Sequence, residues 1–499
     1  MNGVKKIHQI SFIIFLTITS SVFLYSCKQD FVTNDPGTGT PFPDSIATLF
    51  STPFNSTSNT CTNSSCHNTA SKAGGLDLQD WSSAMKGSNN GTMIIPYNGF
   101  WSHITSIVNN DTNISPVSEV LMDLHKMPAD KVSLLMRWIN NGAPNKDGQI
   151  ANQDFSKKCF ITNQAADVVA VVNTENNLVT RLIPVGGRAA LDAPHYIIVD
   201  PQQKYFYVSL IQEGYIEKYD VNTYAQVGRI AVGNNPAHLI ISPDNNFLYV
   251  SNFDASGTER RVKKLSTAGG MSILDTATAV QMNAPHGMAM THNGQYIFVT
   301  SQIGEYIFKI RTSDMEIESQ APIGPGVPPS GNGTSTYRPY QVLISPDDST
   351  LYVTCVGVAG NTTPDFVRVY SARTLEPSVL TPTIQVGDNP LLMKHSRNNQ
   401  YIFVCNRNDG TVTIINTTTN TPFRTVTSVG VQPHGVDFSS DGNYAYIACE
   451  TQSGQDGHHP TVGSFKVGVT RIINMSDFTL NSRRMEMGSF PAGIVCIPY

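Results

Sequence analysis

The stretch Pro236–Asn252, which reads PAHLIISPDNNFLYVSN, contains the pattern that decides the fold of this chain. Its two apolar runs, 236–241 and 247–252, are rich in β-branched and aromatic residues, and the polar turn SPDNN separates them. Short apolar runs divided by a turn of Pro, Asn and Asp are typical of a β-hairpin. The stretch therefore predicts two short antiparallel strands.

The same pattern recurs along the C-terminal part of the chain, and a proline begins each copy. Successive prolines are 42 to 58 residues apart, and each of the first six is followed fourteen residues later by the apolar centre of a second strand. Repeats of this length, each with a strand, a turn and a strand, are typical of β-propeller blades. The seven prolines are Pro194, Pro236, Pro285, Pro339, Pro390, Pro433 and Pro491. We expect residues 155–499 to form an all-β, seven-bladed propeller.

The seventh repeat contains only a first strand, from Ala492 to Pro498. Its partner is predicted at the start of the domain, because residues 159–163 resemble a second strand that no proline hairpin precedes. Pairing of these two segments would close the ring and leave no open sheet edge. A composite blade of N- and C-terminal strands is therefore expected.

The segments FLYVSN at 247–252 and LYVT at 351–354 resemble the YVTN family of β-propellers over roughly residues 155–499. The resemblance implies a lactonase-like propeller fold. It does not decide the activity, because members of that broad group include sugar lactonases, amine-dehydrogenase heavy chains and pure binding proteins.

The first 26 residues are typical of an export signal, in which Lys5 and Lys6 precede an apolar stretch. The segment resembles a bacterial lipoprotein signal, which implies cleavage before Cys27 and lipidation of its sulfur. An uncleaved anchor helix and an ordinary signal peptide are the alternatives. Residues 27–43 are rich in Gly, Pro and Thr and are predicted to be a flexible tether. We expect a protein outside the cytoplasm, lipid-anchored to the cell envelope at the outer membrane, on its periplasmic or surface face.

Residues 44–148 are predicted to form a small, mostly helical domain. A first helix is expected with Asp44 as its cap, and a second after Asp130, with apolar residues at helical spacing and Gly142 as its stop. After Gly148 the sequence changes to short β-branched and aromatic runs. This change marks the junction with the propeller.

The run Cys61-Thr62-Asn63-Ser64-Ser65-Cys66-His67 is the most chemically specific motif of the chain. Two thiols followed at once by a histidine are the pattern that attaches a c-type haem, although the common motif has two residues between the cysteines and this one has four. His67 would bind the haem iron from one side. The alternative is a disulfide between Cys61 and Cys66, which an exported protein could form.

The surrounding sequence resembles the single-haem c-type cytochrome domains of larger exported bacterial proteins. The segments that carry the resemblance are CHN at 66–68, AGGLDL at 73–78, MKG at 85–87, MP at 127–128 and WINNGA at 138–143. It implies an all-α cytochrome domain with one covalent haem and with Met127 as the second axial ligand. His125 or His103 is the bis-histidine alternative, and Met93, Met122 and Met136 are further candidates.

Histidines follow several of the propeller prolines. His195, His286 and His434 come directly after one, and His238 lies one position later in its repeat. If each proline begins an innermost strand, these side chains meet at one rim of the central channel, where they could bind copper, a second haem or an anionic substrate. Packing and hydrogen bonding alone are the alternative. The loop 456–460, with His458 and His459, could overhang the same rim.

The remaining cysteines fall on predicted strands, without the spacing of a metal site. They are expected to be buried, unpaired thiols: Cys159, Cys355, Cys405, Cys449 and Cys496. A formal net charge of -5, with no basic run after the first residues, argues against nucleic acid as a partner.

These features predict an exported, lipid-anchored monohaem cytochrome that transfers electrons. Its propeller would dock a redox partner protein or bind a small-molecule electron donor or acceptor. Two alternatives remain. One is an oxidoreductase with a second metal or cofactor site on the propeller rim, and the other is a propeller lactonase or ligand-binding module.

Overall fold

The computed structural model describes residues 39–54, 60–114, 125–357, 365–450, 460, 463 and 466–498. Two compact units divide the chain, residues 1–35 and 36–499, and every described residue belongs to the second. The predicted signal peptide, Cys27 and the tether up to residue 38 lie outside the described residues, as do Met122, His458 and His459. None of the described helices is long and apolar enough to cross a lipid bilayer.

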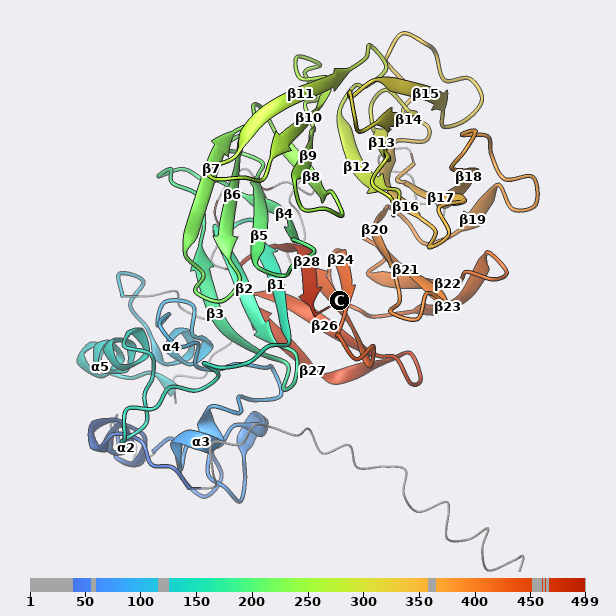
Figure 1. Ribbon diagram of the computed structural model, residues 1–499. Helices are drawn as coiled ribbons and strands as arrows, with labels where there is room; N and C mark the ends of the chain where they lie inside the picture. The colour runs from blue at the N-terminus through green and yellow to red at the C-terminus, as the bar shows by residue number, and fades with distance from the viewer. Residues whose placement is uncertain are drawn as a thin grey trace, which may run out of the picture. The chain divides into compact units, whose positions relative to one another are not determined.

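Seven four-stranded antiparallel sheets form a β-propeller, which confirms the expected seven-bladed, all-β fold (Figure 1). Blade 1 contains β1 (Lys158–Asn163), β2 (Val168–Asn173), β3 (Leu178–Pro184) and β28 (Pro491–Ile497). Blade 2 contains β4 (Pro194–Val199), β5 (Tyr205–Leu210), β6 (Tyr215–Asp220) and β7 (Gln226–Ala231). Blade 3 contains β8 (Pro236–Ile241), β9 (Phe247–Asn252), β10 (Arg261–Ser266) and β11 (Ser272–Thr278).

The other four blades follow in chain order. Blade 4 contains β12 (Pro285–Met290), β13 (Tyr296–Ser301), β14 (Tyr306–Arg311) and β15 (Ile317–Pro322). Blade 5 contains β16 (Pro339–Ile344), β17 (Thr350–Cys355), β18 (Phe366–Ser371) and β19 (Thr383–Gln385). Blade 6 contains β20 (Pro390–His395), β21 (Tyr401–Asn406), β22 (Thr411–Asn416) and β23 (Thr421–Val426). Blade 7 contains β24 (Pro433–Phe438), β25 (Tyr444–Cys449), β26 (Gly468–Asn474) and β27 (Thr479–Met487).

Each of the seven prolines is the first residue of the innermost strand of its blade, and these strands contact one another around the centre. Proline is suited to a strand end because it has no N–H to donate to the ladder. In blades 2 to 7 a register shift follows the proline, so the strand begins with a β-bulge, which re-aims the side chains beside it. The preceding residue is always left-handed, with φ between 42° and 61°: Ala193, Asn235, Ala284, Arg338, Asn389, Gln432 and Phe490.

Strand β28 pairs antiparallel with β1 and completes blade 1, as the sequence predicts. Cys159 lies opposite Cys496, and the two form a disulfide across a separation of 337 residues. The prediction that both are unpaired thiols is therefore wrong. Their spacing along the chain carries no pairing signal, and only ring closure brings them together. The other three strand cysteines, Cys355, Cys405 and Cys449, are buried and free.

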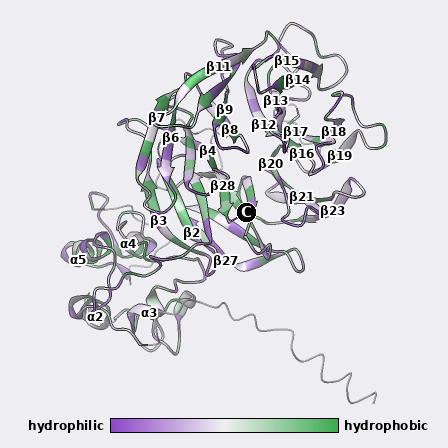
Figure 2. Ribbon diagram, in the orientation of Figure 1, coloured by the Kyte–Doolittle hydropathy of each residue, from purple (hydrophilic) through white to green (hydrophobic). Residues whose placement is uncertain are grey.

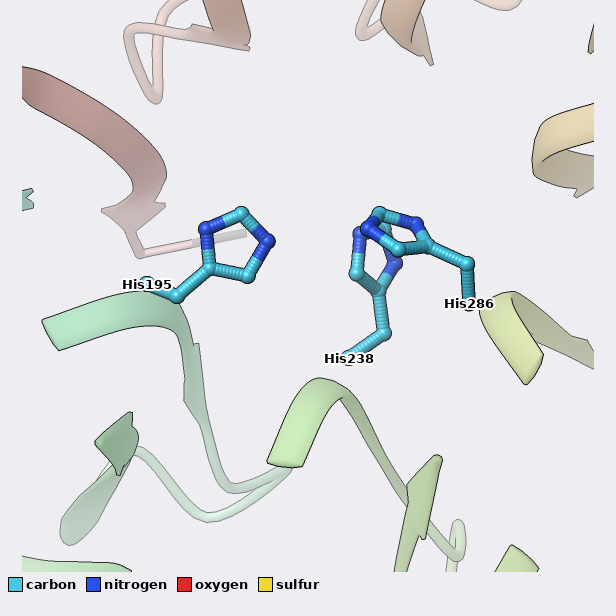
Figure 3. A group of neighbouring side chains, drawn as sticks. All are labelled: His195, His238 and His286. Atoms are coloured by element: carbon cyan, nitrogen blue, oxygen red, sulfur yellow. The ribbon is translucent and has the colours of Figure 1, made fainter. Parts of the chain in front are cut away.

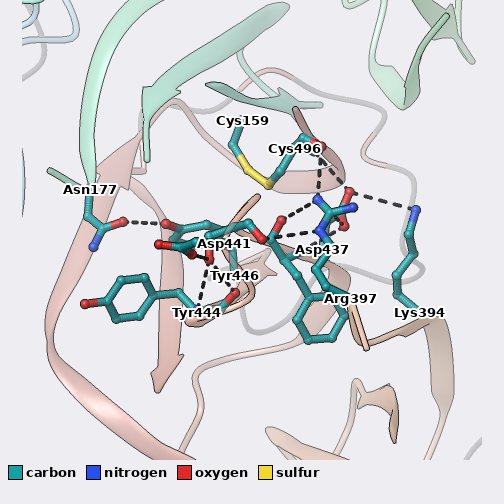
Figure 4. The surroundings of a disulfide bond; sticks show 11 residues. Cys159, Asn177, Lys394, Arg397, Asp437, Asp441, Tyr444, Tyr446 and Cys496 are labelled. Carbon is teal, nitrogen blue, oxygen red and sulfur yellow. Dashed lines mark hydrogen bonds and ion pairs between the residues drawn. A yellow bond between two sulfur atoms is a disulfide. The ribbon is translucent and has the colours of Figure 1, made fainter. Parts of the chain in front are cut away.

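Side chains of blades 6 and 7 also hold β28 in place. Figure 4 shows Asp437 and Arg397 beside the disulfide. The Asp437 carboxylate accepts the Cys496 N–H at 3.0 Å, and the Arg397 guanidinium donates to the Cys496 carbonyl at 3.1 Å. The closing strand is thus fixed by pairing, by a covalent bond and by two polar contacts, one buried and one partly buried.

Apolar side chains fill the space between neighbouring blades. Phe160 of blade 1 stacks on Phe206 of blade 2 with ring centroids 4.8 Å apart, and both rings are fully buried. Figure 2 shows hydrophobic residues along the strands, whereas the outer strands β7 and β11 are largely exposed to solvent. Burial between the blades therefore fixes the positions of the innermost strands, where the candidate site lies.

Within the described residues, the region before the propeller contains four short helices and one 3-10 turn. They are α2 (Asp44–Ser51), η1 (Ala73–Gly75), α3 (Trp81–Ala84), α4 (His103–Val108) and α5 (Ala129–Asn140). Both predicted helices are present, but Pro43 rather than Asp44 holds the cap position of α2. Long irregular segments join these elements, so the region is less helical than expected.

This N-terminal region shares packing with the propeller. Ile95 is buried in a cluster that also contains Cys159 and Met485 of the propeller. The His103 ring lies 3.3 Å from the Glu486 carboxylate on β27. The two regions are therefore joined by an apolar core and an electrostatic contact.

Candidate functional site

Four histidines meet where the innermost strands of the propeller begin. His195, His286 and His434 directly follow the first proline of β4, β12 and β24, and His238 is the third residue of β8. All four side chains are buried, at most 1% exposed. The four histidines expected at one rim thus come together, His238 included.

Three of these histidines form the tightest group. His195, His238 and His286 each offer a ring nitrogen, and these nitrogens all lie within 4.8 Å of one another. The ring centroids are 6.0 Å apart for His195 and His238, 5.8 Å for His195 and His286, and 4.4 Å for His238 and His286. Figure 3 shows the three imidazoles pointing toward one another from neighbouring strands.

His434 lies beside this group and contacts a tyrosine. Its ring centroid is 5.6 Å from that of His195, and its Nε2 is 3.1 Å from the Tyr340 hydroxyl. The Tyr340 ring packs against His286 with centroids 4.0 Å apart. Sequence reasoning missed Tyr340, although it directly follows Pro339 and so occupies the same repeat position as His195 and His286.

Hydroxyl groups on the second strands fix the backbone of the histidines. Ser251 Oγ accepts the His238 N–H at 3.1 Å and donates to the His286 carbonyl at 2.6 Å. Thr162 Oγ1 donates in the same way to the His195 carbonyl at 3.1 Å. Ser251 lies fifteen residues after Pro236, the proline that begins its blade. This spacing could have identified from the sequence the hydroxyl that holds the histidine backbone.

A glycine beside His286 allows the blades to approach closely. A Cβ at Gly287 would lie 2.4 Å from the Gln341 Cα and 2.6 Å from the Tyr340 carbonyl oxygen. Any larger residue would push blades 4 and 5 apart. The Pro-His-Gly sequence therefore combines the strand start, the imidazole and the close blade contact.

The environment keeps at least two of the rings neutral. Burial, followed by the neighbouring histidines, lowers the pKa of His286 well below its ordinary value. Burial, with a smaller effect of the Arg407 charge, lowers the pKa of His434 to about 3. Arg407 itself pairs with the buried Glu450 at 2.7 Å. Neutral imidazole is the form that can bind a metal, whereas a cationic ring would attract an anionic substrate.

The second candidate site is the Cys61–His67 loop. Cys61 and Cys66 are free thiols, half-buried, and are not joined in the alternative disulfide. The His67 N–H donates to the Cys61 carbonyl at 2.9 Å, which folds the loop back on itself. His67 Nδ1 lies 3.0 Å from the Ala73 carbonyl oxygen. This contact fixes the ring, so that Nε2 points away from the Ala73 carbonyl. Burial raises the pKa of the Cys61 thiol to about 12 and lowers the pKa of His67.

The candidate second ligands differ in their surroundings. The His125 ring centroid lies 6.3 Å from that of His67, and the two planes are tilted by 39°. Met127 is 1% exposed and belongs to an apolar cluster against which Cys61 also packs. His103 faces Glu486, and Met93 lies buried in the same apolar cluster as Met127, with Met136 at its edge.

The structure is a seven-bladed β-propeller preceded by a short, partly helical region, and each of the two regions carries one of the candidate sites described above. No family model matches the sequence. The periplasmic gluconolactonase of Pseudomonas aeruginosa has a similar structure, with a TM-score of 0.50 and 15% identity over 69% of this chain and 99% of that chain. A functionally unknown protein of Desulfotomaculum acetoxidans is similar with a TM-score of 0.52 and 11% identity over 68% of this chain and 99% of that chain.

Among curated proteins, the Antigen Lp49 of Leptospira interrogans is 28% identical over 126 residues. The match covers 22% of this chain and 26% of the antigen, so it spans about a quarter of that relative. At these identities the structural likeness shows the lactonase-like propeller fold alone. The chemistry has to be argued from the two groups of side chains described above.

Proposed function

We propose that this chain is an exported electron-transfer protein that carries one c-type haem on Cys61, Cys66 and His67. The propeller docks a redox partner or binds the electron source. The observation that carries the proposal is the arrangement of the Cys61–His67 loop, in which two free thiols precede a histidine whose ring is oriented by a backbone carbonyl.

The residues of the loop fit a haem in three respects. Both thiols remain available for thioether bonds to the vinyl groups. The Ala73 carbonyl fixes the His67 ring through Nδ1, so that Nε2 is the nitrogen for the iron. The adjoining apolar cluster, which includes Trp81 and Leu135, excludes water from one side. When bound, such a haem supplies a one-electron redox centre.

Two side chains compete for the second axial position. Met127 is the ligand implied by the resemblance to cytochromes. His125 is supported by geometry, because two imidazoles that share one metal through bonds of about 2.0 Å have ring centres about 6 Å apart. The separation of 6.3 Å between the rings of His67 and His125 agrees with that value. His125 Nδ1 is also buried without a hydrogen-bond partner.

Export and lipidation belong to the same proposal. The disulfide between Cys159 and Cys496 supports an oxidising compartment, since such bonds are rare in the cytoplasm. Cys27, which directly follows the proposed signal sequence, is the proposed site of lipid attachment. A Cys27→Ala variant should lose radiolabel from palmitate and leave the membrane fraction. Retention of label in this variant would contradict lipidation at Cys27.

Haem attachment is tested with the full chain, co-expressed with c-type haem maturation proteins. We expect a haem-stained band after denaturing electrophoresis and the absorption spectrum of a reduced c-type cytochrome, because thioether bonds survive denaturation. A Cys61→Ala/Cys66→Ala variant should lose the stain. The matched control is Ser64→Ala/Ser65→Ala, which changes only exposed residues of the same loop and should keep it.

A full-length, folded protein without covalent haem would contradict the proposal. Hydrolysis of gluconolactone by that haem-free protein would favour the alternative of a propeller lactonase, the activity named for the Pseudomonas neighbour.

A further inference from the structure

We propose that His195, His238 and His286 bind one divalent ion of a late transition metal, copper or zinc, at the centre of the propeller. The site lies on three consecutive blades and uses none of the residues assigned to the haem. The inference is therefore independent of the proposed electron-transfer function.

The geometry of the three rings carries the proposal. One ring nitrogen from each histidine lies within 4.8 Å of the other two. A tetrahedral ion with metal–nitrogen bonds of about 2.0 Å holds its ligand nitrogens about 3.3 Å apart. Metal binding would therefore require the three nitrogens to move closer together than the 4.8 Å limit within which they now lie. Figure 3 shows the three rings facing the space between their strands.

The backbone that presents the rings is held rigidly. The Ser251 hydroxyl bonds to both His238 and His286, and Thr162 bonds to the His195 carbonyl. Thr162 Oγ1 also accepts the Gly493 N–H at 2.8 Å, so the closing strand β28 supports the same residue. Ligands on rigid strands are held more precisely than ligands on loops, which favours a preorganised site.

Aromatic rings hold the imidazoles from outside the group. Tyr196 stacks on His238 with centroids 4.2 Å apart and planes inclined by 18°. Phe253 lies edge-on to His286 with centroids 5.1 Å apart. These contacts restrict the rotation of two of the three ligands, which lowers the entropy lost on metal binding.

The donor set selects the class of metal. Three imidazoles and no carboxylate suit zinc, copper, iron or nickel, and do not suit calcium or magnesium, which prefer oxygen. Copper has the highest affinity among these divalent ions, and zinc commonly takes a tetrahedral set of imidazoles. Three protein ligands leave a fourth position, as in metal sites that bind a small molecule. His434, in contact with Tyr340, lies beside the three histidines, with its ring centroid 5.6 Å from that of His195.

The experiment uses the full chain with Cys61 and Cys66 replaced by alanine, so that these thiols cannot bind the added metal. Apoprotein is titrated with Cu²⁺ and with Zn²⁺ by calorimetry, and bound metal is counted by mass spectrometry. We expect one equivalent of metal. His238→Gln should weaken its binding at least about tenfold, since even outer-shell partners contribute that much. The matched control His292→Gln, an exposed histidine of the same propeller, should bind like the parent.

Paramagnetic resonance of the Cu²⁺-loaded protein provides a measurement that does not depend on a variant folding. Hyperfine coupling to nitrogen from three imidazoles supports the site. A spectrum without nitrogen coupling, or equal affinity in His238→Gln and the parent, overturns it. Failure to bind either metal also overturns it and assigns the cluster to packing alone. None of these outcomes alters the haem result, which depends on Cys61, Cys66 and His67.

Discussion

The hydroxyl of Ser251 lies 2.6 Å from the carbonyl oxygen of His286 and bridges two blades of the propeller. The Ser251 hydroxyl oxygen also accepts the His238 N–H at 3.1 Å, so one side chain fixes the backbone of two neighbouring histidines. Both bonds are fully buried. Equivalent hydroxyls, such as Thr300 bonded to the Tyr340 carbonyl at 2.9 Å, repeat the contact around the ring.

Replacing Ser251 by alanine leaves a buried N–H and a buried carbonyl without their partner. We expect the free energy of unfolding to fall by about 1–3 kcal/mol. Denaturant unfolding measures the loss. Ser251→Thr keeps the hydroxyl and should recover most of the stability, and Ser313→Ala, at an exposed position, is the neutral control. Equal stability of Ser251→Ala and the parent would show that the bridge contributes nothing.

The disulfide between Cys159 and Cys496 should stabilise the closed ring. Replacing both cysteines by alanine is expected to lower the free energy of unfolding by about 2–5 kcal/mol, because the bond restricts a very long loop in the unfolded chain. Thermal unfolding with and without a reductant measures this effect. The reductant should lower the midpoint of the parent and of Cys449→Ala, which keeps the disulfide, but not that of the double variant.

Removal of residues 490–499 deletes β28 and leaves β1 as an open edge of blade 1. We expect a marked fall in the unfolding temperature and a tendency to aggregate, since an unpaired strand edge recruits other chains. Calorimetry and light scattering measure the two effects. An unfolding temperature equal to that of the parent would contradict closure of the ring by β28.

Asp365 gives the stability of the propeller a dependence on pH. Its carboxylate accepts the N–H of the left-handed Asn389, just before Pro390, at 3.0 Å. Burial, the largest effect, raises the pKa of Asp365 to about 6. The folded state then holds a proton that the unfolded state releases near pH 4, so stability is highest below that pH and falls as the pH rises to about 6.

The isosteric variant Asp365→Asn retains the acceptor and removes the titration. We expect it to flatten the slope of unfolding free energy against pH in that window. Denaturant titrations at several pH values provide the measurement. A parent protein whose stability rises over this window would show that the carboxylate is ionised in the folded state.

The second iron ligand of the proposed haem can be identified by conservative variants. The ring separation of 6.3 Å leads us to expect that His125→Gln changes the visible spectrum and the reduction potential. Met127→Leu conserves volume in the apolar cluster and should leave both unchanged. The opposite result would assign the position to Met127.

The amino-acid sequence alone was sufficient to predict much of the fold. The prolines predicted the innermost strands because proline tolerates only a strand end, and the period of the hairpins predicted seven blades. Strand alternation and turn chemistry act over a few residues, so they can be recognised without knowledge of distant contacts. The composite first blade was predicted because the seventh repeat contains a first strand but not the second strand that should pair with it.

Only the tertiary structure decided which distant residues meet. The repeat pattern placed His195, His238, His286 and His434 at one rim, but the contact of Tyr340 with His286 depends on how closely the blades pack. The pairing of Cys159 with Cys496 likewise depends on closure of the whole ring. Local sequence determined the blades and their order, because strand and turn preferences are local. The ring determined the disulfide and the histidine group, because both join residues that are far apart along the chain.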